Sequence, residues 1–362
     1  MKVLFTFTTK PGFYDAYVHR VMSLKSGLES HNVQTATLYL GDLPLRKPFV
    51  ISPVNIPMIR KYLEGFDFIH AGNTGSAYLM SLARLTRKTD TRIIYDVHGD
   101  IAQESRLRSR GWLDLKNHVN YLQSNVMEAL ASRYSDYFAV CSQSFRDYYV
   151  ARGIGDERIE VLLNGVDIDA FKPRGVPKEG PFTITYAGGS QKWQGIELLL
   201  GAARLLEGKD VRFQVIGLND DIRKALEGKY SNIDFIGFMK RSDLIRHLCG
   251  SDGLIIPRMS HPALEVAFPT KYAEYIACGI PVIVTDVGDA ARLTRQYECG
   301  LVCGTSAASI AEAILNLKSC SPGERKEMGD NGRRLAVDLL DYKKIGQTYY
   351  DFLRKASCRP CM

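Results

Sequence analysis

Short apolar runs rich in β-branched and aromatic residues alternate along the chain with longer segments whose apolar residues recur at helical spacing. In the first half, this pattern predicts strands at 3–7, 35–39, 66–70, 92–96 and 137–141, with helices at 14–30, 76–87 and 117–135. In the second half, it predicts strands at 182–186, 212–216, 233–236, 253–256 and 281–285, with helices at 195–206, 241–249 and 270–278. Strands alternating with helices predict parallel sheets covered by helices on both faces.

A stretch poor in apolar residues separates the two alternating regions. Residues 171–181 contain three prolines and two glycines, which is typical of a linker. With 362 residues, the chain has the length of about two domains. We therefore predict an α/β protein with two doubly wound, Rossmann-like domains at 1–170 and 182–340, joined by a linker at 171–181. Ligands of such sheets bind beyond the carboxyl ends of the strands, and two facing domains would form a cleft.

The composition is that of a soluble globular protein, with 45% hydrophobic and 24% charged residues. The formal net charge of +7 is spread over both halves, so no segment resembles a nucleic-acid-binding arm. This surplus suits phosphates or an anionic membrane surface, although solubility alone would explain it. We see no run of about 18–20 apolar residues and no secretory signal, so we expect a cytoplasmic protein.

The eight cysteines are scattered, and most lie among apolar residues. This pattern indicates buried free thiols in a reducing compartment. Cys358 and Cys361 have the spacing of a redox or zinc half-site. Because they stand at the C-terminal end without a second pair at metal spacing, we interpret them as part of a frayed tail.

The segment 268–283 carries the clearest candidate chemistry. Pro269 and Thr270 open a helix, whose first turn offers free N–H groups and a positive dipole end to a diphosphate. Lys271 adds a positive charge there. Glu274 falls on the same face one turn after Thr270, and its carboxylate suits a ribose because it can accept two hydroxyl protons. The alternative is an ordinary surface helix with a solvated glutamate.

This segment resembles the nucleotide-sugar motif of glycosyltransferases with the GT-B fold, family 4 in particular. That motif is Glu, seven residues, then Glu followed by two hydrophobic residues and Ala-x-Gly-x-Pro-Val. Its second Glu matches Glu274, which in the family binds the ribose hydroxyls. Its first Glu falls on Val266, and Glu265, one residue earlier, is the candidate replacement for binding the donor.

Two further segments resemble the same family in the same order. Residues 164–167 (Asn-Gly-Val-Asp), followed by Phe171 and Pro173, resemble the junction between its two domains. Residues 342–354 resemble its C-terminal helix. The resemblance implies that a helix at 341–356 crosses back to the N-terminal domain.

A glycine-rich loop follows the first strand of the second domain. It includes three small residues that let a phosphate approach the backbone: Gly188, Gly189 and Ser190. The family usually has an arginine after the first glycine and a lysine before the last one, but Gly189 and Gln194 stand there in this chain. We therefore assign Lys192 to the diphosphate. Arg258, at the end of a later strand, is the candidate for the missing guanidinium. A structural loop with a solvated lysine is the alternative.

Polar residues follow the strand predicted at 92–96, where a ligand of a parallel sheet would bind. In family 4, a histidine followed by a glycine at this place lies beside the donor sugar and the acceptor, so the resemblance implies that His98 is the active-site histidine. We assign Asp96 and Asp100 to the acceptor, together with Gly12 in the loop after the first strand. From the residues alone, a single histidine at a strand end is more often structural.

A basic segment lies between the strands predicted at 92–96 and 137–141. Three arginines alternate with other residues ahead of a tryptophan, at Arg106, Arg108, Arg110 and Trp112. These residues suit an anionic lipid carrier or membrane headgroups, which would place the protein at the inner face of a membrane. A solvated basic loop explains them equally well.

Taken with the resemblance, these residues imply a retaining glycosyltransferase that needs neither a metal ion nor another cofactor. Its donor would be a nucleotide-diphosphate sugar, and its acceptor a glycan or lipid-linked molecule in cell-surface polysaccharide synthesis. Its catalytic residues would be His98, Lys192 and Arg258. A front-face mechanism, in which the leaving phosphate helps to deprotonate the acceptor, is what the resemblance suggests.

Three other functions remain to be weighed. A nucleotide dehydrogenase is disfavoured because the first strand–helix turn lacks Gly-x-Gly-x-x-Gly, and no Walker loop, zinc-ligand cluster or Gly-x-Ser-x-Gly is present. A non-catalytic GT-B-like scaffold or regulatory subunit is supported by Val266, Gly189 and Gln194 and opposed by His98 and Glu274. A sugar-nucleotide epimerase of the same fold is the weaker alternative.

Overall fold

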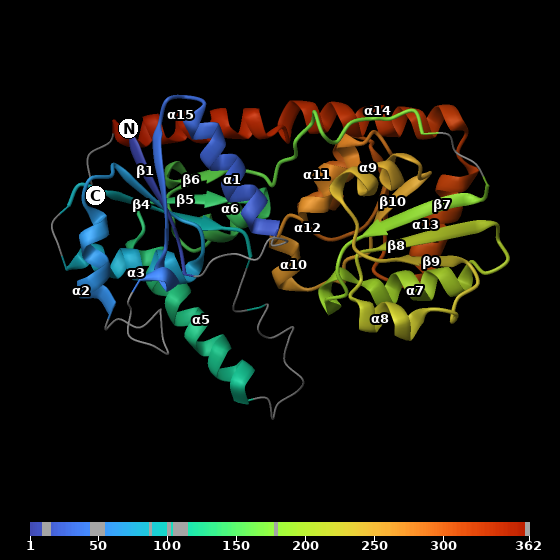
Figure 1. Ribbon diagram of the computed structural model, residues 1–362, viewed down its shortest axis with the longest axis horizontal. Helices are drawn as coiled ribbons and strands as arrows, with labels where there is room; N and C mark the ends of the chain where they lie inside the picture. Colours follow the sequence, from blue (N-terminus) through green and yellow to red (C-terminus); the bar gives the residue numbers. More distant parts are fainter. Residues whose placement is uncertain are drawn as a thin grey trace. The chain divides into compact units, whose positions relative to one another are not determined.

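The computed structural model describes residues 1–8, 16–43, 55–86, 89–99, 103, 115–176 and 180–358. The chain divides into two compact units, which we describe separately. Unit 1 comprises Met1–Leu163 and Tyr342–Met362, and unit 2 comprises Asn164–Asp341. Each unit contains a six-stranded parallel sheet with helices on both faces (Figure 1). The predicted α/β class with two doubly wound sheets is therefore confirmed.

The sheet of unit 1 has the strand order β2-β1-β3-β4-β5-β6. Its strands are β1 (Lys2–Phe7), β2 (Gln34–Tyr39), β3 (Phe68–Ala71), β4 (Arg92–Val97), β5 (Tyr137–Val140) and β6 (Ile159–Val161). The first five lie where the sequence pattern predicts them. The sequence pattern did not predict β6, because it is only three residues long and has a single buried side chain, Ile159.

Helices cover this sheet. They are α1 (Ala16–Glu29), α2 (Ile56–Ile59), α3 (Thr74–Leu85), α5 (Leu115–Tyr134), α6 (Gln143–Val150) and the C-terminal α15 (Tyr342–Ser357). Helix α15 packs against α1 at two glycines, since a Cβ on Gly346 would lie 2.6 Å from the Cα of Gly27. From this close crossing, Tyr349 and Phe352 of α15 enter the core under the sheet.

The sheet of unit 2 has the strand order β12-β11-β10-β7-β8-β9. Its strands are β7 (Phe182–Ala187), β8 (Val211–Ile216), β9 (Ile233–Ile236), β10 (Gly253–Ile256), β11 (Val282–Thr285) and β12 (Gly300–Cys303). Its helices are α7 (Ile196–Leu205), α8 (Asp220–Leu226), α9 (Arg241–Cys249), α10 (Pro262–Val266), α11 (Thr270–Ala277), α12 (Gly288–Gln296), α13 (Ala307–Ser319) and α14 (Pro322–Leu339).

The boundary between the units falls at Leu163 and Asn164, earlier than the 171–181 stretch that the composition indicates. Side-chain hydrogen bonds attach the intervening residues to unit 2. Asn164 Nδ2 donates to the carbonyl of Phe268 over 2.6 Å, and Arg333 Nη1 donates to the carbonyl of Phe171 over 2.7 Å. Proline and glycine content reports local backbone preference and carries no information about such distant partners.

Five of the cysteines in the described part of the chain differ clearly in burial. Cys141, Cys249, Cys278 and Cys299 are buried and form no disulfide, whereas Cys358, also outside any disulfide, is exposed. Cys361 lies outside the described residues. Among the helices that the structure describes, none combines the length and the apolar character needed to cross a bilayer.

Candidate functional site

Helix α11 presents a less buried face that carries three of the predicted site residues. Its core face is formed by Tyr272, Ala273, Tyr275, Ile276 and Ala277. Thr270, Lys271 and Glu274 are each half-buried and lie on the opposite side. Pro269, with an extended backbone, precedes the helix, and no side chain caps its start. The N–H of Tyr272 donates to the carbonyl of Pro269 over 3.0 Å, and the N–H groups of Thr270 and Lys271 precede it at the positive end of the helix dipole, where an anion is favoured.

Glu274 is held beside cations. Its Oε1 lies 3.9 Å from Nη2 of Arg241, which comes from the start of α9. Burial raises the pKa of Glu274, while Arg241 and Lys271 pull it back down. A half-buried carboxylate in this setting can accept hydrogen bonds from paired hydroxyl groups, which is the chemistry a ribose needs.

The glycine-rich loop after β7 packs closely against its neighbours. Gly195 has a φ of +71°, and a Cβ there would overlap the carbonyl oxygen of Pro257, so only glycine fits. A Cβ on Gly188 would overlap the Nζ of Lys271. Gly189 and Ser190 are half-buried, and the carbonyl of Gly189 accepts a 2.7 Å hydrogen bond from Tyr186. The side chain of Lys192 is exposed.

Arg258 holds the backbone of the segment that precedes α11. This residue is 7% exposed, and its Nη1 donates to the carbonyl of Ala267 over 2.7 Å. Its own carbonyl accepts a 2.7 Å hydrogen bond from Thr285. Arg258 therefore fixes the backbone just before α11 at the carboxyl end of β10, and its catalytic role stays a prediction.

Glu265 caps a neighbouring helix. Its Oε2 accepts a 2.9 Å hydrogen bond from the backbone N–H of Gly288, the first residue of α12. A carboxylate at that helix start also interacts favourably with the helix dipole. This capping role was missed from the sequence, and it competes with the predicted role of Glu265 in binding the donor. The half-buried Val266 stands at the family's first Glu position.

Asp96 in unit 1 is buried in an ion pair rather than open to an acceptor. Its Oδ1 lies 2.8 Å from Nη2 of Arg20, and both side chains are almost fully buried. Burial alone would raise the pKa of Asp96, but Arg20, followed by His70 and His98, holds it well below its usual range. This carboxylate is thus enclosed and neutralised by Arg20, and its role toward the acceptor stays a prediction.

The same carboxylate connects two histidines. His70 Nε2 lies 3.3 Å from Asp96 Oδ2, and its Nδ1 lies 2.7 Å from the hydroxyl of Tyr349 in α15. His98 Nδ1 lies 3.6 Å from Asp96 Oδ2, while 21% of the His98 side chain remains exposed. His98 is therefore the accessible end of a buried polar chain at the carboxyl end of β4. Sequence reasoning found both Asp96 and His98 but missed Arg20.

Several predicted residues fall outside the described part of the chain. They are Gly12, Asp100, Arg106, Arg108, Arg110 and Trp112. Among the described residues, no group of three or more histidine, cysteine, aspartate or glutamate side chains is placed to hold a metal ion.

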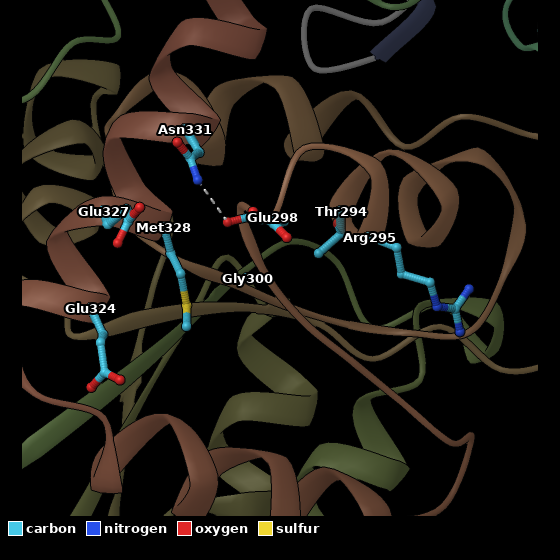
Figure 2. Close-up of a pocket in the computed structure, with 8 residues that line it drawn as sticks. All are labelled: Thr294, Arg295, Glu298, Gly300, Glu324, Glu327, Met328 and Asn331. Atoms are coloured by element: carbon cyan, nitrogen blue, oxygen red, sulfur yellow. Dashed lines mark hydrogen bonds between the residues drawn. The ribbon is translucent and has the colours of Figure 1, made fainter.

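A pocket of about 330 Å³ lies elsewhere in unit 2, lined by residues of α12, β12 and α14 and their connections (Figure 2). Figure 2 shows Glu298, Glu324 and Glu327 around it, with Asn331 Nδ2 donating to the carbonyl of Glu298 over 3.2 Å. Three carboxylates would repel a phosphate. None of the predicted site residues that the structure describes lines this pocket, so it is a poor candidate for the diphosphate.

Two family models match the chain. The model described as Glycosyltransferase Family 4 matches residues 12–170, and the model described as Glycosyl transferases group 1 matches residues 167–335. Together they extend from residue 12 to residue 335, through both units. The chain belongs to glycosyltransferase family 4. As a member of this family it is a transferase, which disfavours the scaffold, epimerase and dehydrogenase alternatives.

Individual relatives of this family 4 enzyme agree with that assignment. This chain is 23% identical over 357 residues to the MMP alpha-(1->4)-mannosyltransferase of Mycolicibacterium hassiacum. The match covers 94% of this chain and 82% of the relative. The chain is 30% identical over 226 residues to a D-inositol 3-phosphate glycosyltransferase of an Arthrobacter species, covering 54% of this chain and 52% of the relative.

The solved structures support the GT-B fold. The crystal structure of Anabaena Alr3699/HepE in complex with UDP and glucose matches this family 4 enzyme with a TM-score of 0.71 and 19% identity. The match covers 98% of this chain and 99% of that chain. At this level of identity the likeness concerns the fold alone.

Proposed function

We propose that this family 4 enzyme transfers a sugar from a nucleotide-diphosphate sugar to a glycan or lipid-linked acceptor in cell-surface polysaccharide synthesis. The transfer retains the anomeric configuration and needs no metal ion. The main support is the position of Glu274, on the half-buried face of α11 and one turn from the start of that helix, which no side chain caps. The structure of HepE with UDP and glucose adds support for a nucleotide-diphosphate donor.

The donor binds to unit 2 through groups of complementary chemistry. Glu274 accepts hydrogen bonds from the two ribose hydroxyls. The diphosphate lies at the first turn of α11, where backbone N–H groups and the helix dipole favour negative charge. Gly188 and Gly189 let the phosphates approach the loop backbone. Breaking the glycosidic bond places negative charge on the diphosphate, so this preorganised positive end lowers the barrier.

The buried state of Asp96 makes it unsuitable as a covalent nucleophile, which is consistent with the front-face mechanism that we propose. A double-displacement mechanism would require a carboxylate that can reach the anomeric carbon. Asp96 is enclosed and paired with Arg20 at 2.8 Å, so it does not serve as that nucleophile. The leaving phosphate then takes the acceptor proton, and the exposed edge of His98 donates a hydrogen bond to a sugar hydroxyl.

Product analysis tests these points. Purified enzyme is incubated with UDP-glucose, GDP-mannose and ADP-glucose, each with a membrane-lipid extract as acceptor, with and without EDTA. We expect release of one nucleoside diphosphate, unchanged by EDTA, and a new glycosidic bond with the donor's anomeric configuration by NMR. Glu274→Gln should weaken donor use, whereas Glu207→Gln, an exposed glutamate of unit 2, should not. Loss of turnover with EDTA or an inverted product would contradict the proposal.

A further inference from the structure

We propose that the Lys271 ammonium, oriented by Gln194, is the cation that contacts the donor diphosphate, in place of the loop cations usual in the family. This inference rests on the proposed donor site in unit 2. It reassigns the charge from Lys192, the cation that the sequence of the loop suggests, to a residue of α11. It also gives Gln194 a function as a positioning residue.

The geometry brings the Lys271 side chain back over the glycine-rich loop. Lys271 Nζ donates a 2.8 Å hydrogen bond to Oε1 of Gln194. It also lies 4.3 Å from the centre of the Tyr186 ring, within the range of a cation–π contact. A Cβ on Gly188 would overlap the same nitrogen. The ammonium therefore lies directly over the backbone that the phosphates are expected to approach.

Gln194 occupies the position at which the family usually has a lysine. Because its Oε1 is only 2.8 Å from Lys271 Nζ, the ammonium of Lys271 stands close to where a lysine at 194 would end. The positive charge is thus supplied by helix α11 instead of the loop, at nearly the same position. Lys192 is exposed, in contrast to the half-buried Lys271.

The groups around Lys271 do not fully compensate the positive charge of its ammonium. Burial and the Arg258 guanidinium lower the pKa of Lys271 to about 7, and Glu274 only partly offsets them. The other groups near this cluster are the Tyr186 phenol and Arg241, which lies beside Glu274. An arriving diphosphate supplies the missing negative charge and favours the protonated amine.

Two measurable consequences follow. Binding at pH 7 takes up about half a proton at Lys271, since an amine with a pKa of about 7 is half protonated before the diphosphate arrives. Relative to Lys271→Met, in which the terminal phosphate still titrates near pH 6, affinity of the wild type for the diphosphate falls as the pH rises above about 7, by about tenfold between pH 6 and pH 8. A bare nucleoside, which has no phosphate to meet Lys271, should show neither effect.

Isothermal titration with UDP, GDP, ADP and TDP tests the inference, using the diphosphate that binds the wild type and its parent nucleoside. Lys271→Met removes the charge, and Lys271→Met/Gln194→Lys returns it to the loop. Lys192→Met tests the competing assignment, and Lys224→Met, an exposed lysine of α8, is the matched control. Circular dichroism checks that each variant is folded.

We expect Lys271→Met to weaken diphosphate binding by about 10- to 100-fold, as loss of a charge-assisted hydrogen bond does, and to abolish proton uptake. Nucleoside binding should stay within about threefold, and Gln194→Lys in the double variant should restore much of the lost affinity. A larger loss with Lys192→Met than with Lys271→Met would overturn the inference while leaving the donor site standing. Failure of all four diphosphates to bind the wild type would overturn the donor site as well.

Discussion

The buried ion pair between Arg20 and Asp96 gives the sharpest prediction about stability. Oδ1 of Asp96 accepts hydrogen bonds from Nη2 of Arg20 over 2.8 Å and from Nε over 3.1 Å, and Oδ2 accepts one from Nε over 3.3 Å. Both side chains are almost fully buried. Asp96→Asn keeps the shape but removes the charge, which leaves Arg20 buried without a counter-ion. Breaking such a pair from one side costs about 3–5 kcal/mol.

Native-state hydrogen exchange at the amides of β1, β3 and β4 measures this loss within unit 1, because the two units need not unfold together. We expect the opening free energy of these strands to fall by about 3–5 kcal/mol in Asp96→Asn. Asp147→Asn, an exposed aspartate of α6, should change it by less than about 0.5 kcal/mol. The double variant Arg20→Met/Asp96→Asn leaves no unpaired charge. Its loss of opening free energy should therefore be smaller than the sum of the losses in the two single variants, by about 2 kcal/mol or more.

The pH dependence provides a second check on the same pair. Because the folded pKa of Asp96 is depressed, its contribution to stability is present above the unfolded pKa of about 3.9 and is lost as the pH falls through the folded pKa. The difference between wild type and Asp96→Asn should therefore shrink below about pH 4. A loss under 1 kcal/mol at pH 7 with additive single effects would refute the reasoning.

Two further substitutions test contacts in unit 2. Glu265→Ala removes the acceptor of the Gly288 N–H, so thermal unfolding should show a loss of about 0.5–2 kcal/mol, whereas Glu312→Ala on the exposed face of α13 should show almost none. Gly195→Ala places a Cβ against the Pro257 carbonyl at a φ of +71°, so hydrogen exchange of the loop should become faster and stability should fall by about 1–3 kcal/mol. An unchanged melting temperature in either variant would contradict the corresponding contact.

The elements that the sequence predicted well are those with a strong local pattern. Strands β9 and β10 and helix α9 have the predicted bounds, because apolar runs or helical spacing are framed there by polar residues. Helix α14 was missed although it has 18 residues, since its buried residues are only Gly329, Gly332, Leu335 and Ala336. Strand β12 was missed because it is short and its residues are only half-buried.

The candidate site likewise combines residues that a local pattern indicates with partners that it does not indicate. Glu274 and Lys271 could be proposed as site residues because the residues that begin α11 are neighbours in the sequence. The side chains that pair with the site residues are distant in sequence. Arg20 meets Asp96 across 76 positions, and Lys271 meets Gln194 across 77. Local patterns cannot indicate which distant side chains the packed sheets bring together.

The most direct test of the central claim is binding of nucleoside diphosphates to unit 2 through Glu274. Thermal unfolding is followed with UDP, GDP, ADP and TDP, with NAD as the control ligand, for wild type, Glu274→Gln and the control Glu207→Gln. A ligand at a hundred times its dissociation constant stabilises the folded state by about 2.7 kcal/mol. We expect a clear rise in melting temperature with one diphosphate, lost in Glu274→Gln and kept in Glu207→Gln. No shift at millimolar ligand, or an equal shift in Glu274→Gln, would contradict the donor site.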